Sequence, residues 1–291
     1  MLMPSVQTEM FRHGGVTLCR FRCPAGHDRW QRENRINDGH NIVFPELPVE
    51  IRPADHPGVL ADPNLAVFYN NGDPYRRELV HPDGDSANIF LFADEHLMPA
   101  LAPFDPDPDP DRPLSMRVGR VETGTFLKQR LLLARVSRRP APDPGWVVEQ
   151  AVMILEEVLA AAYGEPMVSP GECSSTMRRQ RERVEQVKRL LFRYFAQPIS
   201  LPQLADSVET SVYHLCRIFR CHTGQTINGY LQRLRQREGL ASLEKTDTPL
   251  ADLALDVGYA HQSHFTAAFR REYGLPPGEL RRQLNSSSLR A

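Results

Sequence analysis

Two stretches in the C-terminal part of this 291-residue chain repeat one pattern, and this repeat constrains the fold more than any other feature. The first stretch places Leu204-Ala205 before a turn and the segment Ser211–Phe219. The second places Leu253-Ala254 before Gly258 and the segment His261–Phe269. A small alanine allows two helices to approach closely, and glycine adopts the left-handed backbone that ends a helix. Each stretch therefore predicts a short helix, a turn and a second helix, which is a helix–turn–helix unit.

Apolar residues recur at helical spacing through almost the whole C-terminal part, so we expect an all-helical domain there. Pro249 stands at the start of one predicted helix, where proline is favoured. The predicted helices span 178–196, a short stretch from Ser200, a stretch from Ser211, 227–243, 249–256, 261–273 and a last turn at 279–283.

The second helix of each unit leaves one face polar. Such side chains can reach base edges and phosphates when a helix lies in the major groove of DNA. A long helix between the units could hold both faces on one side of a duplex, with half-sites about 34 Å apart. The residues expected to contact DNA are Tyr213, His214, Cys216, Arg217 and Arg220 in the first unit and His261, Gln262, Ser263, His264 and Arg270 in the second.

The two parts of the chain carry opposite charge. Residues 1–176 hold 17 Lys and Arg against 25 Asp and Glu, a net charge of −8. Residues 177–291 hold 18 against 11, a net charge of +7. This asymmetry favours a polyanionic partner for the C-terminal part. A surface of solvated arginines with no such partner is the alternative explanation.

The segment from about 184 to 283 resembles the AraC-type (AraC/XylS) transcription regulators, and the match runs without a gap. The matching motifs are Leu204-Ala205-Asp206, the run from Ser211 to Phe219, Thr223-Gly224-Gln225, Tyr230-Leu231, Leu234-Arg235, the run from Ala254 to Tyr259, Gln262-Ser263-His264-Phe265, Ala268-Phe269-Arg270-Arg271 and Gly274-Leu275-Pro276-Pro277. The resemblance implies a sequence-specific regulator of transcription that binds double-stranded DNA, and it leaves contact with RNA polymerase open. It also implies an N-terminal domain, often a small β-barrel, that binds a small-molecule or protein effector or mediates dimerisation.

Three positions depart from the family pattern. Ala260 stands where a Ser or Asp often caps the second recognition helix, so we expect that helix to start less firmly. Ala267 stands where a longer polar residue often reaches DNA. Gly239 replaces a usual alanine inside the long linking helix, which we expect to cost about 1 kcal/mol of local helix stability.

A fourth departure affects the first unit. Cys216 occupies a position expected to face bases, but a thiol cannot make a bidentate contact. We therefore expect Tyr213 and Arg217 to carry more of the reading by the first unit. The second unit is expected to read fewer bases, through residues 261–263.

Residues 1–98 are predicted to be rich in β-strands. Apolar residues alternate or run together in short segments, and the turn Asn70-Asn71-Gly72-Asp73 follows one of them. The strand candidates are 16–23, 41–44, 49–51, 65–69 and 88–92. This spacing predicts a sandwich or barrel. Residues from about 10 to 100 also resemble a sensor type that accompanies AraC-type DNA-binding units.

Two helices are predicted after the strands, at Thr123–Arg138 and Trp146–Tyr163. The second helix carries an apolar stripe of Val148, Val152, Leu155, Leu159 and Ala162. Packing of the stripe on the β domain and self-association of two chains fit this pattern equally well.

Two proline-rich regions interrupt the pattern. Pro99–Pro113 contains four aspartates that alternate with prolines, so it is predicted to be an exposed extended loop, too stiff to wrap a calcium ion easily. Gly164–Met177 is short and polar and is predicted to be an interdomain linker. The expected domains are therefore 1–165, a linker at 166–177, and a DNA-binding domain at 178–285.

A metal- or thiol-dependent enzyme domain is the alternative for the N-terminal part. It holds six histidines but no His-x-His pair, which a metal-binding cupin usually shows. Cys19, Cys23 and His27 could form part of a zinc site, but a structural zinc needs four ligands. Two half-buried cysteines and an exposed loop histidine are the favoured explanation. Neither a Gly-x-Ser-x-Gly motif nor a phosphate-binding glycine loop appears.

Two groups of N-terminal residues could bind a ligand. Tyr75, Arg76 and Arg77 could bind an anion, although an ordinary basic strand facing water is favoured. Trp30 and Phe44 could line a ligand pocket, although an aromatic residue in a barrel is more often part of the core.

The sequence as a whole predicts an α+β protein. A β-barrel or cupin-like sensor domain with two appended helices precedes an all-α domain with two helix–turn–helix units. We expect an effector-responsive transcriptional regulator, of the activator type but with repression open, and no catalysis, cofactor or metal. No run of eighteen apolar residues exists, so no membrane span is expected. Five scattered cysteines favour a reducing cytoplasm over a disulfide framework.

Overall fold

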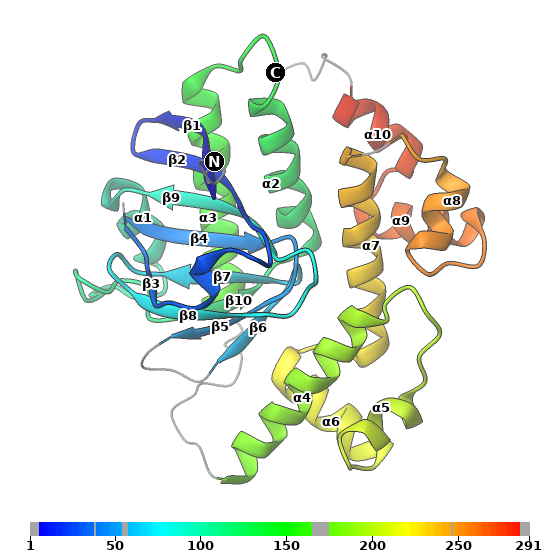
Figure 1. Cartoon of the computed structure of the whole chain (residues 1–291). Helices are drawn as coiled ribbons and strands as arrows, with labels where there is room; N and C mark the ends of the chain where they lie inside the picture. The colour runs from blue at the N-terminus through cyan, green and yellow to red at the C-terminus, as the bar shows by residue number, and fades with distance from the viewer. Residues whose placement is uncertain (1–5, 38, 54–57, 165–174, 246, 286–291) are drawn as a thin grey trace. The chain divides into compact units, whose positions relative to one another are not determined.

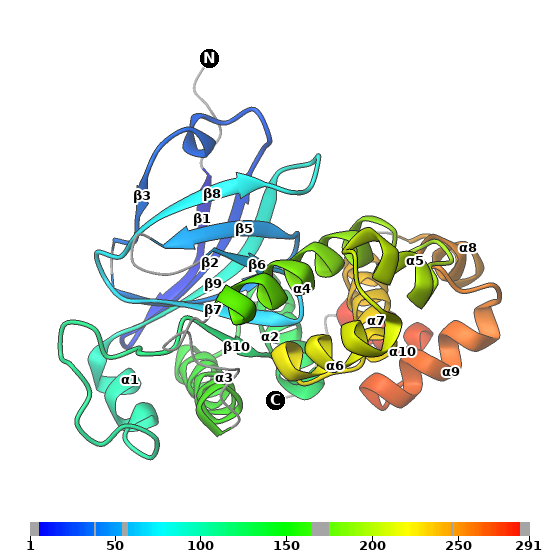
Figure 2. The same cartoon turned by 90° about the horizontal axis from the view of Figure 1, so that it is seen from below.

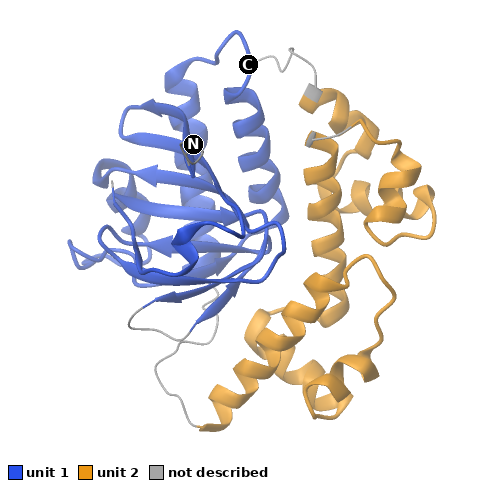
Figure 3. Cartoon of the chain, in the orientation of Figure 1, with its two compact units in different colours: residues 1–166 blue, residues 167–291 orange. Residues whose placement is uncertain are grey.

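The computed structural model describes residues 6–37, 39–53, 58–164, 175–245 and 247–285. The chain divides into two compact units, residues 1–166 and residues 167–291 (Figure 3). Among the described residues, no helix is long and apolar enough to cross a membrane.

The N-terminal unit is built on two antiparallel sheets. The six-stranded sheet has the order β1-β2-β9-β4-β7-β10, and the four-stranded sheet has the order β3-β8-β5-β6 (Figure 1). The strands are β1 (Gln7–His13), β2 (Val16–Cys23), β3 (Asn34–Arg35), β4 (His40–Pro45), β5 (Val49–Pro53), β6 (Val59–Ala61), β7 (Leu65–Tyr69), β8 (Pro74–Leu79), β9 (Asp85–Phe92) and β10 (Val118–Arg120). The five predicted strands are confirmed, and β2 and β7 have the predicted bounds.

The six-stranded sheet is buried on both faces near its centre, as β9 shows. All eight residues of β9 are buried. Ala87 and Ile89 pack with Phe21 in one apolar cluster, whereas the Phe90 ring lies edge-on to Phe44 at 5.2 Å. Because side chains alternate along a strand, these two sets point to opposite faces of the sheet. The turn at Asn70–Asp73 joins β7 of this sheet to β8 of the four-stranded sheet.

Three helices cover the face of the six-stranded sheet that points away from the four-stranded sheet. They are α1 (Asp94–Leu101), α2 (Thr123–Val136) and α3 (Pro144–Gly164). In Figure 2, α1 and α3 lie on one side of the six-stranded sheet and strands β5 and β8 lie on the other. A buried ion pair between Arg130 and Glu46 holds α2 to the sheet, and Ser86 Oγ donates to Glu46 at 2.7 Å.

The apolar stripe of α3 packs within its own unit. Its buried residues are Val147, Ala151, Ile154, Leu155, Val158, Leu159 and Ala162. The predicted stripe was out of phase by one residue at its start, because Val148 and Val152 are only half-buried. Packing of this helix on its own unit is therefore confirmed, and self-association stays a prediction.

Helix α1 was not predicted. Its Pro99 lies inside the helix, in the region predicted to be an extended loop. Pro99 is exposed, while Leu97, Ala100 and Leu101 are buried, so packing of one apolar face compensates for the lost amide donor. Residues 105–111 do form the predicted loop and are mostly exposed.

The C-terminal unit is helical throughout its described residues. Its helices are α4 (Ser175–Arg193), α5 (Leu201–Ser207), α6 (Val212–Thr223), α7 (Ile227–Lys245), α8 (Leu250–Asp256), α9 (Gln262–Tyr273) and α10 (Pro277–Asn285). Helix α4 begins three residues before the predicted Arg178, and its buried residues are Val184, Val187, Lys188, Leu191 and Phe192. Of the predicted linker at 166–177, residues 166–174 lie outside the described residues. The remaining three, Ser175–Met177, belong to α4.

Candidate nucleic-acid interface

The first helix–turn–helix unit consists of α5 and α6, and a serine caps each helix. Ser200 and Gln203 form a capping box at the start of α5. At the start of α6, Ser211 Oγ accepts a hydrogen bond from the His214 amide at 3.2 Å. These caps satisfy amide groups that would otherwise lack partners, so both helices begin at fixed residues.

The inner face of this unit forms part of a continuous core. Leu204 and Ala205 of α5 pack with Leu215, Ile218 and Phe219 of α6. The same cluster includes residues of α4 and of the first half of α7, and Leu215, Ile218 and Phe219 are all buried. The orientation of α6 is therefore fixed from three sides, and its remaining face is turned to solvent.

The exposed face of α6 carries three of the predicted DNA-binding residues. Tyr213, Arg217 and Arg220 are exposed and spaced i, i+4 and i+7, so they lie in one row. The Tyr213 side chain is 81% exposed, although tyrosine is usually at least partly buried. The two arginines form no ion pair with any carboxylate in the described part of the chain.

Two other predicted residues of α6 lie beside this row. His214 and Cys216 are half-buried. Cys216 packs against the apolar core of the unit, so its thiol is turned partly away from the exposed face. We therefore infer a smaller part in DNA contact for these two residues than for the row of three.

The second unit, α8 and α9, has a different entry to its second helix. His261 is the N-cap of α9, but its side chain makes no capping hydrogen bond. The uncapped position is therefore His261, one residue after the Ala260 considered in the sequence analysis. Pro249 likewise occupies the N-cap of α8 rather than the first helical position.

The exposed face of α9 carries the predicted residues of the second unit. His261, Gln262, Ser263, His264 and Arg270 are all exposed. The His261 and His264 rings contact each other edge-on, with centroids 5.7 Å apart. Gln262, Ser263 and Arg270 line a shallow groove together with Thr266, Ala267 and Arg271. Thr266 and Arg271 were missed, although their spacing from Gln262 and Ala267 by four residues was a usable signal.

Helix α7 lies between the two units in the chain and makes side-chain hydrogen bonds near both. Arg235 Nε donates to the Phe195 carbonyl at 2.7 Å, close to the start of the first unit. On the second unit, the Tyr259 hydroxyl donates to Gln232 Oε1 at 2.7 Å. One helix thus contacts both the segment that leads into the first unit and the turn of the second unit.

Gly239 also serves this arrangement. A Cβ atom at this position would lie 2.9 Å from Cε2 of Phe265, the first buried aromatic residue of α9. The glycine therefore lets α9 pack closely on α7. The expected cost to the local stability of α7 stays a prediction, and the contact with Phe265 gives the glycine a packing role beside it.

The N-terminal unit offers little support for metal chemistry among its described residues. Cys19 and Cys23 are free thiols buried in the same apolar cluster of β2. His27 Nδ1 accepts a hydrogen bond from the Arg29 amide at the start of a short helix. Within the described ranges, no three His, Cys, Asp or Glu residues gather in a way that could hold a metal ion.

Comparison with known proteins finds a family model and several relatives that match parts of this chain. A family model described as a helix-turn-helix domain matches residues 204–283. The regulatory protein SoxS of Salmonella typhimurium is 34% identical over 88 residues, which cover 30% of this chain and 82% of SoxS. The HTH-type transcriptional activator RhaS of Escherichia fergusonii is 27% identical over 168 residues, and the match spans 58% of each protein.

A solved structure of apo ToxT, a variant of the protein from Vibrio cholerae, aligns with 94% of this chain and 99% of its own length. Its sequence identity is 8% and its TM-score is 0.40.

Proposed function

Because this chain belongs to the AraC family of helix-turn-helix transcriptional regulators, we propose that it binds double-stranded DNA in a sequence-specific way and regulates transcription. The observation that carries this proposal is the pair of exposed helical faces on α6 and α9. Arg217, Arg220 and Arg270 stand there without an ion pair to any carboxylate among the described residues. An arginine with no intramolecular partner is free to pair with phosphate or with a guanine edge.

The two kinds of contact have different roles in this proposal. Arginines near the backbone neutralise phosphates and set affinity, which makes binding sensitive to salt. Side chains that enter the groove select sequence. The row of Tyr213, Arg217 and Arg220 has the reach for both roles. The shorter side chains of Ser263 and Ala267 give α9 less reach into a groove, so α6 is the principal reader.

The test is selection of bound sequences from a random duplex library with the full-length protein. Two short segments about one helical turn apart are expected, with the stronger preference in the segment that α6 reads. A variant with Arg217, Arg220 and Arg270 all replaced by Gln should lose enrichment. A matched variant with Arg178, Arg193 and Arg282 replaced, which are exposed arginines outside α6 and α9, should keep it. Equal enrichment by both variants would refute the assignment of the two faces.

We also propose that the N-terminal unit binds an effector that changes how the DNA-binding unit acts. The support is its cavity between two sheets, described below. The name of the relative RhaS, a transcriptional activator, favours activation of transcription for this chain, with contact to RNA polymerase as part of that role. Such a regulator acts in the compartment that holds the DNA, which is the cytoplasm in a bacterium. A reporter gene placed behind the selected sequence should rise when the full chain is expressed, and a fall would indicate repression.

A further inference from the structure

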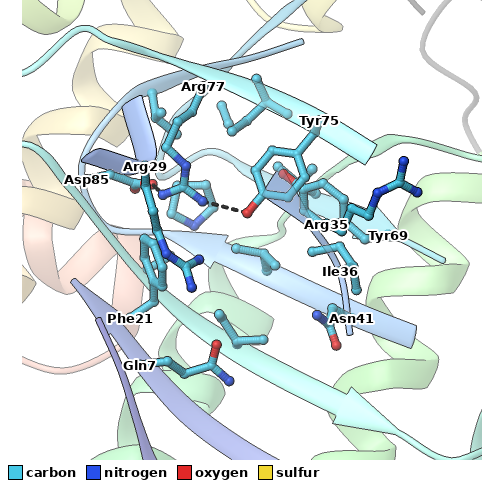
Figure 4. Close-up of a pocket in the computed structure, with 18 of the residues that line it drawn as sticks. Gln7, Phe21, Arg29, Arg35, Ile36, Asn41, Tyr69, Tyr75, Arg77 and Asp85 are labelled. Atoms are coloured by element: carbon cyan, nitrogen blue, oxygen red, sulfur yellow. Dashed lines mark hydrogen bonds and ion pairs between the residues drawn. The ribbon is translucent and has the colours of Figure 1, made fainter. Parts of the chain in front are cut away.

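The N-terminal unit contains a cavity of about 180 Å³ between its two sheets (Figure 4). Aliphatic residues from both sheets form part of its wall, and the charged residues Arg29, Arg77 and Asp85 lie together on one side (Figure 4). The aliphatic wall includes Ile36, Val43, Val49, Ile51, Val67 and Ile89. A cavity of about 150 Å³ is large enough to hold a benzene molecule, so this one accepts a ligand of similar or slightly larger size.

The polar end is built around Arg77, which is 4% exposed. Its Nη1 donates to Asp85 Oδ2 at 2.8 Å and its Nη2 donates to the Tyr75 hydroxyl at 2.6 Å. The guanidinium also lies 4.6 Å from the centre of the Phe21 ring. Burial raises the pKa of Asp85 to about 6, while the charge of Arg77 opposes this change. The prediction of a basic strand that faces water is therefore wrong for Arg77, although it holds for the exposed Arg76.

Three buried polar atoms of residues that line the cavity have no hydrogen-bond partner in the described part of the protein. They are Nε of Arg77 and Oδ1 of Asp85 at the polar end, and Oδ1 of Asn41 on the other side of the cavity (Figure 4). One is a donor and two are acceptors, and all three belong to residues that line the cavity. Buried polar groups in native proteins are almost always paired, so these atoms indicate the hydrogen bonds that a bound molecule would complete.

A second arginine gives this end of the cavity a net positive charge. Arg29 is half-buried in the short helix η1 (Asp28–Trp30) and reaches the same end of the cavity as Arg77 (Figure 4). Within the described residues its guanidinium forms no ion pair. Arg35, by contrast, is paired with Glu33 at 3.2 Å and points away from the cavity. Since Asp85 neutralises Arg77, the charge of Arg29 is left for a ligand.

We propose that this cavity binds a small organic carboxylate with an apolar, ring-sized body and at least one hydroxyl or N–H donor. The carboxylate would accept hydrogen bonds from Arg29 and from Nε of Arg77. The donor would satisfy Oδ1 of Asn41 or of Asp85, and the body would pack against the aliphatic wall. Trp30 and Phe44, considered above as pocket residues, lie beside the cavity and in the core of the unit respectively.

The proposal names the ligand class for the effector role proposed above and so rests on it. Binding is therefore measured without DNA, and failure here would leave the DNA-binding assignment intact. Both tryptophans of the chain, Trp30 and Trp146, belong to the N-terminal unit, so thermal unfolding followed by tryptophan fluorescence reports on that unit alone.

The experiment uses the full-length protein with salicylate, 4-hydroxybenzoate and mandelate, each compared with its neutral amide. At least one acid should raise the melting temperature and bind in calorimetry, at least tenfold more tightly than its amide. Arg29→Met should weaken that acid at least tenfold and leave the amide unchanged. Arg76→Met, which removes an outward-facing arginine of strand β8, should change neither.

A second variant tests the donor. Asn41→Leu should reduce the affinity for the hydroxylated acid to that for the parent acid without the hydroxyl group. Acids and amides that bind equally, an Arg29→Met variant that binds as well as the wild type, or no binding by any of the three acids would each overturn the proposal.

Discussion

In the first helix–turn–helix unit the recognition helix starts with a serine whose hydroxyl caps the helix, whereas in the second it starts at a histidine whose side chain caps nothing. The remaining plan is shared. Both helices have twelve residues, end at a left-handed glycine and bury aromatic or aliphatic residues at matching positions. Leu215 and Phe219 of α6 correspond to Phe265 and Phe269 of α9, which are all fully buried.

The outer faces of the two helices differ more than their cores. The exposed row Tyr213, Arg217 and Arg220 of α6 corresponds to Ser263, Ala267 and Arg270 of α9. One long aromatic and one long cationic side chain are thus replaced by short ones. The cores must support the same packing, but each outer face has only to meet its own stretch of DNA. A duplicated unit can therefore keep its fold while one copy reads sequence and the other mainly holds the backbone.

The turn before each recognition helix offers the largest expected effect. Both turns need a left-handed residue, which is Glu209 in the first unit and Gly258 in the second. A Cβ atom on Gly258 would lie 2.9 Å from the backbone of Ala196, which cannot move aside easily. Gly258→Ala should therefore cost about 2–4 kcal/mol of unfolding free energy, through strain and overpacking.

The matched change in the first unit is Glu209→Gly, which should alter the unfolding free energy by less than about 1 kcal/mol. Urea denaturation of the full chain, followed by far-UV circular dichroism, measures both. Similar losses of unfolding free energy in the two variants would contradict the steric role given to Gly258 beside Ala196.

The outer faces offer the next largest effect. Arg217→Ala should weaken binding to the selected sequence by about 1–3 kcal/mol and relax the preference at one position, if the side chain reads a base. Its counterpart Ala267→Arg should add a phosphate or base contact, and the salt slope should become steeper by about 0.9 if the new contact is to phosphate. Fluorescence anisotropy with labelled duplexes at several salt concentrations measures both. Uniform weakening of all sequences by Arg217→Ala would make Arg217 a phosphate contact and would remove the asymmetry between the units.

Helix α7 gives a third comparison. Gly239→Ala would normally stabilise a helix by up to about 1 kcal/mol, but here the added methyl group meets the Phe265 ring at 2.9 Å. We expect a net loss of about 1–2 kcal/mol in unfolding free energy. The exposed Gly229 near the start of the same helix is the control, since Gly229→Ala should be neutral or slightly stabilising. Stabilisation by both changes would show that α9 can shift without cost.

These glycines illustrate where sequence reasoning is sufficient and where it is not. The strand Val16–Cys23 and the capped starts at Ser200 and Ser211 were predicted closely, because alternation and capping are properties of neighbouring residues. The close approach of Gly239 to Phe265 joins residues on two helices, and no local pattern indicates it.

The same limit applies to the cavity and to two of the helices. Alternation along β8 correctly separates Arg77 from Arg76, but it does not indicate which of them faces the second sheet. The one-residue error in the α3 stripe has a similar origin. In an almost entirely apolar helix, the surface on which it packs decides which residues are buried, and the sequence does not. Helix α1 was missed because Pro99 is a strong local signal that tertiary packing overrides.

The helix starts themselves allow a smaller test. Ser211→Ala should cost about 1 kcal/mol of unfolding free energy, because the His214 amide loses its partner. In the second unit, His261→Ser should gain a similar or smaller amount, since His261 occupies the N-cap with no capping bond. Ala260→Ser lies one residue outside the cap and should change little. Chemical denaturation of the three variants checks this, and a larger gain from Ala260→Ser would place the start of α9 one residue earlier.

The smallest effect concerns pH and is confined to the first unit. Burial lowers the pKa of His222, in the last turn of α6, while Glu185 of α4 raises it and Arg181 of α4 lowers it further. Its buried Nε2 has no hydrogen-bond partner. The folded state therefore resists protonation more than the unfolded state, whose pKa is about 6.5. Unfolding free energy should fall as the pH drops below that value, because the unfolded state then binds more protons.

His222→Gln should remove this part of the pH dependence. The unfolding free energy of the variant minus that of the wild type should therefore be larger at pH 5.5 than at pH 8. Denaturation curves at the two pH values measure the difference, and a constant difference would show that His222 titrates equally in both states. The corresponding residue of α9 is Glu272, which pairs with Arg233 at 3.6 Å, so this dependence has no counterpart in the second unit.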